Sequence, residues 1–316
     1  MDNRYCEKAR TYWTPERVVR VTGGKKLHLL PDESPALLRI MGLLNADGSM
    51  ADRSVSKYRQ INHLLAMIGP RLLPLAKRNQ PLYILDACCG NSFLSLLVIW
   101  FLSEKNGVEL RLVGIDRNES VVAASRERVA SLGWSDRAVF ATGDICLQSW
   151  NTAVRGGFET EEGLGQLPNA VIALHACDTA SDDALALGVE CRADLIAVAP
   201  CCQGELARAW KLREGAEHPL KIFFETPTLR RETAAQVTDG MRMLLMQGEG
   251  YETSALEFVP SDHTPKNRLI LCERTSRCFD AAGIAGYHAL REHSGGDDIK
   301  LAKKLRPAAY FPGSIQ

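Results

Sequence analysis

Apolar residues recur at helical spacing through the first 80 residues, with no alternating runs among them. One helix is expected to begin near Pro35, because the apolar residues after it are spaced as on one helix face. A second amphipathic helix is expected over residues 55–68. We therefore expect residues 1–80 to form a helical N-terminal extension.

From Pro81 the pattern changes to short apolar runs that alternate with amphipathic stretches. Strands are expected at residues 82–87, 110–115, 137–142, 170–174 and 194–199, and helices at 92–106, 118–132, 182–190 and 229–247. Residues 156–168, rich in Gly and Glu, are expected to form a surface loop. Two further strand-like stretches, 251–259 and 268–272, have no helix between them and predict an antiparallel hairpin. This order indicates an α/β fold with a doubly wound, Rossmann-like, mostly parallel sheet.

The composition excludes several classes of protein. With 316 residues and 46% hydrophobic side chains, the chain is neither disordered nor a coiled coil. The longest apolar run, residues 93–102, is short of the roughly 18–20 residues that span a bilayer. The first ten residues are polar and do not resemble a signal peptide, so we expect a cytoplasmic protein without a membrane partner. The ten cysteines are then core thiols, metal ligands or catalytic groups.

Charge is distributed unevenly although the formal net charge is zero. Residues 1–80 hold 14 basic and 7 acidic side chains, and residues 263–316 hold 9 and 5, so the centre is acidic. Basic N- and C-terminal regions can bind RNA, and a solvated surface is the alternative interpretation. The sequence does not indicate an oligomeric state.

Acidic residues follow three successive strands, where ligands bind in open α/β sheets. Asp86 opens a turn of small residues that ends at Ser92, Asp116 ends the second strand, and Asp144 follows the third. The turn has a single glycine, Gly90, and so is a poor match to a dinucleotide fingerprint. The three acids predict a nucleoside ligand, with Asp116 accepting from a ribose diol.

These motifs resemble a class I S-adenosylmethionine-dependent methyltransferase. Residues 174–182 (LHACDTASD), 199–203 (APCCQ) and 263–267 (HTPKN) resemble one branch, which includes relatives of the eukaryotic tRNA 2′-O-methyltransferase that acts on the acceptor stem. The helix segment 57–62 (KYRQIN) is similar to bacterial members. One departure is Asn91-Ser92, where the family usually has glycine second, so the loop is expected to lie slightly further from the amino-acid end of the cofactor.

The resemblance implies a fold, a cofactor and an activity. The fold is a seven-stranded sheet of order 3-2-1-4-5-7-6 in a methyltransferase domain over residues 81–275, followed by a C-terminal tail of unknown structure over 276–316. The activity is methyl transfer from S-adenosylmethionine, with RNA modification by 2′-O methylation favoured. The implied cofactor contacts are Asp86, Ala87, Cys88, Gly90, Asp116, Arg117, Asp144, Ile145 and His175.

Candidate catalytic residues follow the fourth and fifth strands and the hairpin turn. His175 is the candidate acid or base because the free pKa of histidine lies near neutrality, and a packed histidine without a direct catalytic role is the alternative interpretation. Lys266 is a candidate for stabilising an alkoxide or phosphate, and Cys201 and Cys202 are expected to line the acceptor pocket. The cysteines at the strand ends are small packing residues, nucleophiles like those of C5-pyrimidine methyltransferases, or soft metal ligands; without a Cys-x-x-Cys pair, no metal is assigned.

Four further residues are candidate substrate contacts: Lys57, Gln60, Asp178 and Asn267. Lys57 and Gln60 are one helical turn apart, and a solvated helix face explains them equally well. Asp178 has a second interpretation as the cap of the next helix. Two other functions remain open. One is a methyltransferase for a protein side chain or small metabolite. The other is a protein without catalysis that senses the cofactor or holds a metal.

Overall fold

A computed structural model describes residues 3–158, 165–174, 176–200, 203–257, 268–277 and 279–305. The candidate residues His175, Cys201, Cys202, Lys266 and Asn267 lie outside these ranges. Among the described helices, none is both long enough and apolar enough to cross a bilayer.

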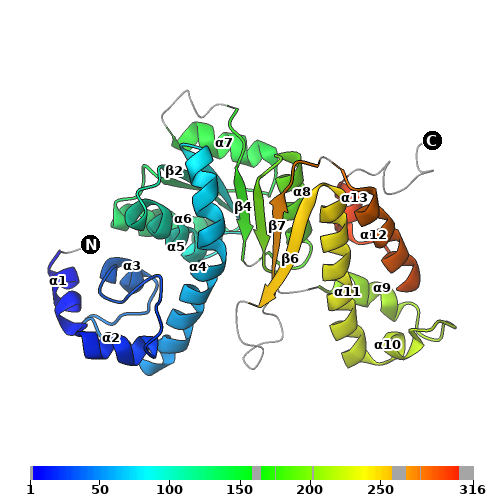
Figure 1. Cartoon of the computed structure of the whole chain (residues 1–316), viewed down its shortest axis with the longest axis horizontal. Coiled ribbons are helices and arrows are strands. Elements are labelled where there is room, and N and C mark those ends of the chain that lie inside the picture. Colours follow the sequence, from blue (N-terminus) through cyan, green and yellow to red (C-terminus); the bar gives the residue numbers. More distant parts are fainter. Residues whose placement is uncertain are drawn as a thin grey trace.

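Seven strands form one sheet in the order β3-β2-β1-β4-β5-β7-β6 (Figure 1), which confirms the predicted fold and strand order. The strands are β1 (Leu82–Ala87), β2 (Leu110–Asp116), β3 (Ala138–Thr142), β4 (Ala170–Ala173), β5 (Leu195–Val198), β6 (Tyr251–Glu257) and β7 (Arg268–Arg274). The first five pair in parallel. Strand β7 runs antiparallel to both β5 and β6, so the expected antiparallel hairpin is confirmed.

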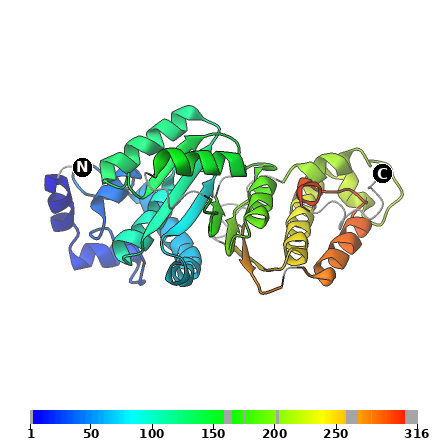
Figure 2. The same ribbon diagram turned by 90° about the horizontal axis from the view of Figure 1, so that it is seen from above.

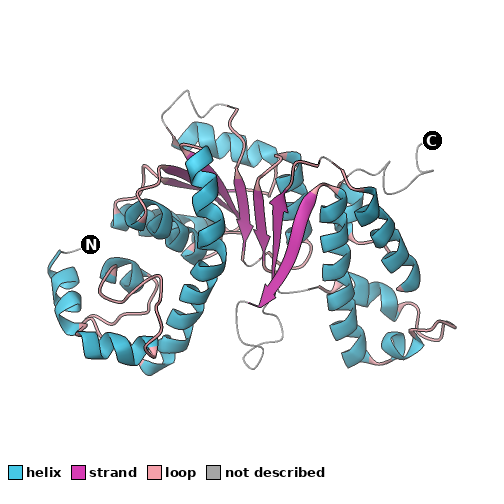
Figure 3. Ribbon diagram, in the orientation of Figure 1, coloured by secondary structure: helices cyan, strands magenta, loops and turns pink. Residues whose placement is uncertain are grey.

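Helices lie on both sides of the sheet and extend beyond each end of it (Figures 2 and 3). The helices before β4 are α1 (Asn3–Tyr12), α2 (Pro15–Thr22), α3 (Pro35–Ile40), α4 (Asp52–Arg78), α5 (Phe93–Ile99), η1 (Trp100–Lys105), α6 (Glu119–Leu132) and α7 (Leu147–Gly157). After β4 come α8 (Ala180–Glu190), α9 (Glu205–Lys211), α10 (Lys221–Glu225), α11 (Pro227–Gly248), α12 (Ala281–His293) and α13 (Lys300–Lys304).

Alternate residues of each strand face opposite sides of the sheet and supply two separate cores. In β1, Leu82 and Ile84 pack with α4, α5, η1 and α6. Tyr83 and Leu85 pack on the other side with α7, α8 and α11, and the C-terminal helices α12 and α13 join this core. The C-terminal region, whose structure the sequence left open, thus contributes buried residues such as Tyr287 and Leu301.

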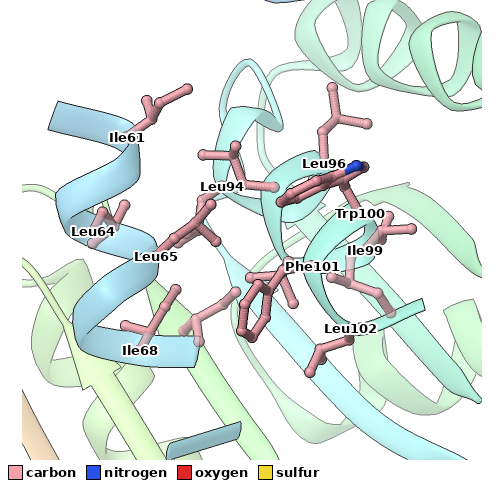
Figure 4. Packing of buried hydrophobic residues seen from close by; sticks show 14 of the residues in the cluster. Ile61, Leu64, Leu65, Ile68, Leu94, Leu96, Ile99, Trp100, Phe101 and Leu102 are labelled. Atoms are coloured by element: carbon pink, nitrogen blue, oxygen red, sulfur yellow. The ribbon is translucent and has the colours of Figure 1, made fainter. Parts of the chain in front are cut away.

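Helix α4 forms the main contact between the N-terminal region and the sheet domain (Figure 4). Its residues Ile61, Leu64, Leu65 and Ile68 pack against α5 and η1. A Cβ on Gly69 would lie 2.6 Å from the Phe101 ring, so glycine permits this close approach. The sequence prediction ended this helix too early, at residue 68; the helix continues through Pro70 and Pro74, which are typical helix breakers. Burial of the apolar face beyond them carries the helix to Arg78.

Other elements also differ from expectation. Helix α7 was not predicted, and its last two residues fall in the segment expected to be a surface loop. The expected helix 92–106 is α-helical only to Ile99 and continues as the π-helix η1, a form that is rare and often marks functional regions. Helix α8 begins with Thr179 at its N-cap, so Asp178 does not cap it.

A buried ionic network joins α8 to α11. Arg242 of α11 is 1% exposed, and its guanidinium donates from Nε and Nη2 to the two carboxylate oxygens of Asp182, each at 2.9 Å. Its Nη1 contacts Asp239 at 3.2 Å. Asp239 also accepts from Arg268 of β7 at 2.7 Å and from the amide of Gln203 at 3.2 Å. The buried Asp182, Asp239 and Arg242 balance in charge with the partly exposed Arg268, which makes the burial of the first three tolerable.

We predict that Arg242→Met lowers the free energy of unfolding by about 3–5 kcal/mol, because it leaves the buried Asp182 carboxylate without its ionic partner. Urea unfolding measures this loss. Arg277→Met removes an exposed arginine that pairs with Asp280 at 3.4 Å and serves as the control, with an expected change within about 0.5 kcal/mol. Equal effects of the two substitutions would contradict the assignment.

Candidate functional site

The carboxyl ends of the five parallel strands lie at one edge of the sheet, the lower edge in Figure 1. Helix α4 begins near this edge and runs upward, away from it. Asp86, Asp116 and Asp144 all lie at or just after strand ends here, as the sequence indicated. This edge is therefore where a ligand of the sheet is expected.

The loop after β1 has left-handed backbone at alternate positions. The φ angles are +58° at Cys88, +49° at Gly90 and +57° at Ser92. A non-glycine residue in this region costs about 1–2 kcal/mol, so two of the three positions are strained. Ser92 is buried, and its N–H donates to the Cys89 carbonyl at 2.7 Å. Although residue 92 is serine rather than glycine, its backbone therefore adopts the left-handed conformation that glycine favours.

Asp116 ties this loop to the end of β2. Its Oδ2 accepts from the Gly90 N–H and its Oδ1 accepts from the Asn118 N–H, each at 3.0 Å. Each carboxylate oxygen has a second lone pair, so Asp116 can accept one further hydrogen bond at each oxygen. The same side chain therefore shapes the loop and can still contact a ligand.

Asp86 lies beneath the loop and is 1% exposed. Its Oδ2 accepts a short hydrogen bond from the Ser95 hydroxyl. Burial raises the pKa of Asp86 to about 7, and the nearby charge of Asp116 acts in the same direction, while Ser95 opposes it. Asp86, which supports the loop from below, is thus a carboxyl group with a pKa near neutral pH.

Asp144 and Ile145 follow β3 at the same edge. Asp144 accepts from Arg117 Nε at 2.5 Å, and both side chains are exposed. Ile145 is half-buried and lines a cavity of about 330 Å³ between the start of α7, α8 and α13. In this cavity wall Asp183 pairs with Lys304 at 2.6 Å. The structure thus brings the predicted cofactor residues of three strand ends together.

The described cysteines at this edge are poor nucleophiles. Burial raises the pKa of the Cys88 thiol to about 11, and burial also raises the pKa of Cys89. Both therefore remain protonated at neutral pH. Cys177 is disulfide-bonded, which differs from the expectation of reduced cysteines. Among the described residues, no three His, Cys, Asp or Glu side chains gather as metal ligands.

Asp178 has a positioning role. Its Oδ1 accepts from the Gly204 N–H at 2.9 Å, and its Oδ2 accepts from Arg208 at 2.8 Å. It therefore holds the start of α9 against the segment that follows β4. Both carboxylate oxygens of Asp178 already have protein partners. The predicted contact of Asp178 with substrate stays a prediction.

Lys57 and Gln60 lie on α4 one turn apart, Lys57 exposed and Gln60 half-buried. The Lys57 ammonium lies 4.6 Å from the centre of the Phe93 ring, directly beside the loop. Sequence reasoning missed Ser95, Phe93 and Asp183. Ser95 lies inside an apolar run, a local signal for a buried hydroxyl with a partner, whereas nothing local marked Phe93 or Asp183.

Gly90→Ala tests the strained loop. A Cβ at Gly90 has no neighbour closer than 3.9 Å, so the left-handed φ alone should lower the free energy of unfolding, by about 1–2 kcal/mol. Gly156→Ala is the control, because Gly156 lies in α7 with open space around it and alanine there should add up to about 1 kcal/mol. Urea unfolding that changes in the same direction for both would contradict this assignment.

Asp86 should make stability fall as pH rises. A folded-state pKa of about 7, above the unfolded value of 3.8, means that the folded chain holds this proton more tightly. Between about pH 4 and pH 7 the wild type should therefore lose up to about 4 kcal/mol relative to Asp86→Asn, since one pH unit corresponds to about 1.4 kcal/mol. The measurement is urea unfolding of both proteins across this range. Parallel curves would show that Asp86 ionises normally.

A protein-family model described as "Methyltransferase domain" matches residues 56–209. Among similar solved structures, a methyltransferase from Geobacter sulfurreducens is 18% identical, with 83% of this chain and 98% of that chain covered and a TM-score of 0.40. The SAH-bound methyltransferase of Podospora anserina is 13% identical, with 84% and 97% covered and a TM-score of 0.43. Magnesium protoporphyrin IX methyltransferase from Synechocystis with bound SAM is 14% identical, with 76% and 90% covered and a TM-score of 0.40. Comparison with curated proteins found no match. The match to this methyltransferase-domain model begins in α4 and ends in α9.

Proposed function

We propose that this chain is a cytoplasmic S-adenosylmethionine-dependent methyltransferase whose acceptor is a ribose 2′-hydroxyl of RNA. The observation that carries the cofactor assignment is the hydrogen bond from the Gly90 N–H to Asp116. It places a carboxylate next to a loop with left-handed backbone at the carboxyl edge of the sheet. The match of residues 56–209 to a methyltransferase domain supports the reaction type.

The residues at this edge fit the nucleoside part of S-adenosylmethionine. Asp116 retains a free lone pair on each oxygen, which suits the two hydroxyls of a ribose. Asp144 is exposed and would accept from the adenine amine, and Ile145 offers an apolar side chain beside it. The exposed Arg117 lies between these positions in the chain and binds Asp144.

The loop suits the amino-acid end of the cofactor. Gly90 leaves space beside its Cα, where a Cβ would meet only the Cys88 carbonyl, at 3.9 Å. A backbone without side chains in the way can approach a ligand closely. Ala87 is buried beneath the loop, and Cys88 is half-buried within it. These residues would hold and orient the cofactor.

When bound, the cofactor supplies a methyl group on a sulfonium, and in-line alignment provides much of the catalysis. A hydroxyl acceptor must also lose its proton, which needs a base. We assign this role to His175 and assign stabilisation of the alkoxide to Lys266, with Cys201 and Cys202 lining the acceptor pocket. Gln203 directly follows Cys202, and Arg268 lies two residues after Lys266; both side chains donate hydrogen bonds to Asp239.

The charge of the N-terminal region favours an RNA acceptor. Residues 1–80 carry twice as many basic as acidic side chains, and they adjoin the sheet edge through α4. Some of the basic side chains of the C-terminal region already pair with a carboxylate. Burial raises the pKa of Asp183, but Lys300 and Lys304 both bind its carboxylate and together hold this pKa below its usual value.

The acceptor is tested by transfer from methyl-labelled S-adenosylmethionine into extract of a strain that lacks the protein. We expect label that RNase removes and that digestion recovers as 2′-O-methyl nucleosides. His175→Ala should lower this transfer by about 100-fold or more while cofactor binding persists, because a general base contributes about 10²–10⁴ in rate.

Label that protease alone removes would contradict the RNA acceptor and favour a protein side chain. Label in neither macromolecular pool would favour a small metabolite or a protein without catalysis. Label in RNA bases, without 2′-O-methyl nucleosides, would keep the RNA and contradict the acceptor atom.

A further inference from the structure

Two cations lie over one aromatic ring beside the loop. Phe93 is the first residue of α5 and directly follows Ser92. The Lys57 ammonium from α4 lies 4.6 Å from the centre of its ring, and the Arg128 guanidinium carbon from α6 lies 5.7 Å from it. Three helices therefore converge to place two positive charges next to the proposed cofactor loop. We call Lys57, Phe93 and Arg128 the cation–aromatic cluster.

The positive charge of this cluster is not neutralised by the chain. Arg128 donates to the Asn91 carbonyl at 3.2 Å, and no described carboxylate lies within 4.0 Å of either cation. Neighbouring arginines differ, since Arg126 pairs with Glu119 and Arg137 pairs with Glu104. A charge left without a counterion at the rim of a site attracts an anionic ligand.

The cluster is arranged to meet a ligand from solvent. Lys57 is exposed, while Arg128 and Phe93 are half-buried. Stacking over the ring restricts both flexible side chains, so less conformational entropy is lost when an anion binds them. Arg53 is also exposed and precedes Lys57 by one turn of α4, which sets the two side chains on one face about 5–6 Å apart.

We propose that the cation–aromatic cluster binds the phosphodiester backbone of the RNA acceptor and positions it at the cofactor loop. This inference rests on the proposed function. The exposure of Lys57 and its continuity with Arg53 and the basic N-terminal region favour an extended anion over the single carboxylate of the cofactor. Phosphate contacts of this kind orient a nucleic acid without reading its sequence.

The test uses the double variant Lys57→Gln/Arg128→Gln in the full chain. The matched control is Lys77→Gln/Arg78→Gln, which removes two exposed charges from the last turn of the same helix, about 30 Å along its axis from Lys57. Two ligands are titrated separately: a fluorescent RNA stem-loop with a single-stranded 3′ end, by anisotropy, and S-adenosylhomocysteine, by calorimetry. Equal urea midpoints establish that both variants are folded.

We expect the cluster variant to bind the RNA about tenfold or more weakly, and the salt dependence of log K to fall by about 1.4–1.8, since each phosphate contact contributes about 0.7–0.9. The control should change RNA binding less than about twofold, as should the charge-retaining variant Lys57→Arg/Arg128→Lys, because binding to phosphate needs the charge. Binding of S-adenosylhomocysteine should not change in any variant.

Unchanged RNA affinity in the cluster variant would overturn the proposal. Weaker binding of S-adenosylhomocysteine with unchanged RNA binding would overturn it too and assign the cations to the cofactor's carboxylate. The outcome is separable from that of the labelling experiment. RNA binding that depends on the cluster supports the inference even where the methyl group is transferred to another acceptor.

Discussion

The ion pair between Arg242 and Asp182 is the constraint on which one side of the site depends. Both side chains lie in the interior, so neither can lose its partner without leaving a charge in a medium that solvates it poorly. Through Asp239 the same guanidinium is linked to Gln203 after β5 and to Arg268 at the start of β7. One buried arginine thus fixes the positions of α8, α11 and the two chain segments next to the candidate acceptor pocket.

The other side of the site depends on Asp116 and on strain in the loop that it holds. Left-handed backbone at Cys88 and Ser92 is unfavourable by itself and persists because neighbouring hydrogen bonds fix the loop. The Gly90 N–H is bound to Asp116, and Asp86 supports the loop from below through Ser95. The cofactor side is therefore preformed by short-range contacts, whereas the acceptor side is positioned by a long-range ionic network. The proposed methyl transfer would depend on alignment of these two parts of the site, which different contacts hold in place.

The sequence was informative where function depends on local pattern. Short apolar runs between amphipathic stretches located the strands, and the acidic residues at the strand ends, Asp86, Asp116 and Asp144, located the candidate site. It was uninformative where contacts join distant residues. Asp182 and Arg242 are 60 positions apart, and each resembles an ordinary surface charge in its own helix. Phe93 and its two cations come from three helices that meet only in the folded chain. Helix α4 exceeded its predicted end because burial of Leu72 and Leu75 outweighs two prolines, a balance that propensity alone does not measure.

The central claim is that the carboxyl edge of the sheet holds S-adenosylmethionine through Asp116. Calorimetric titration of S-adenosylhomocysteine into the wild type, Asp116→Asn and Asp136→Asn tests it most directly, since Asp136 is an exposed aspartate outside the site. The account predicts that the wild type and Asp136→Asn bind equally and that Asp116→Asn binds about tenfold or more weakly, the loss expected for charged hydrogen bonds. Equal affinity of all three proteins, or no binding by the wild type, would contradict it.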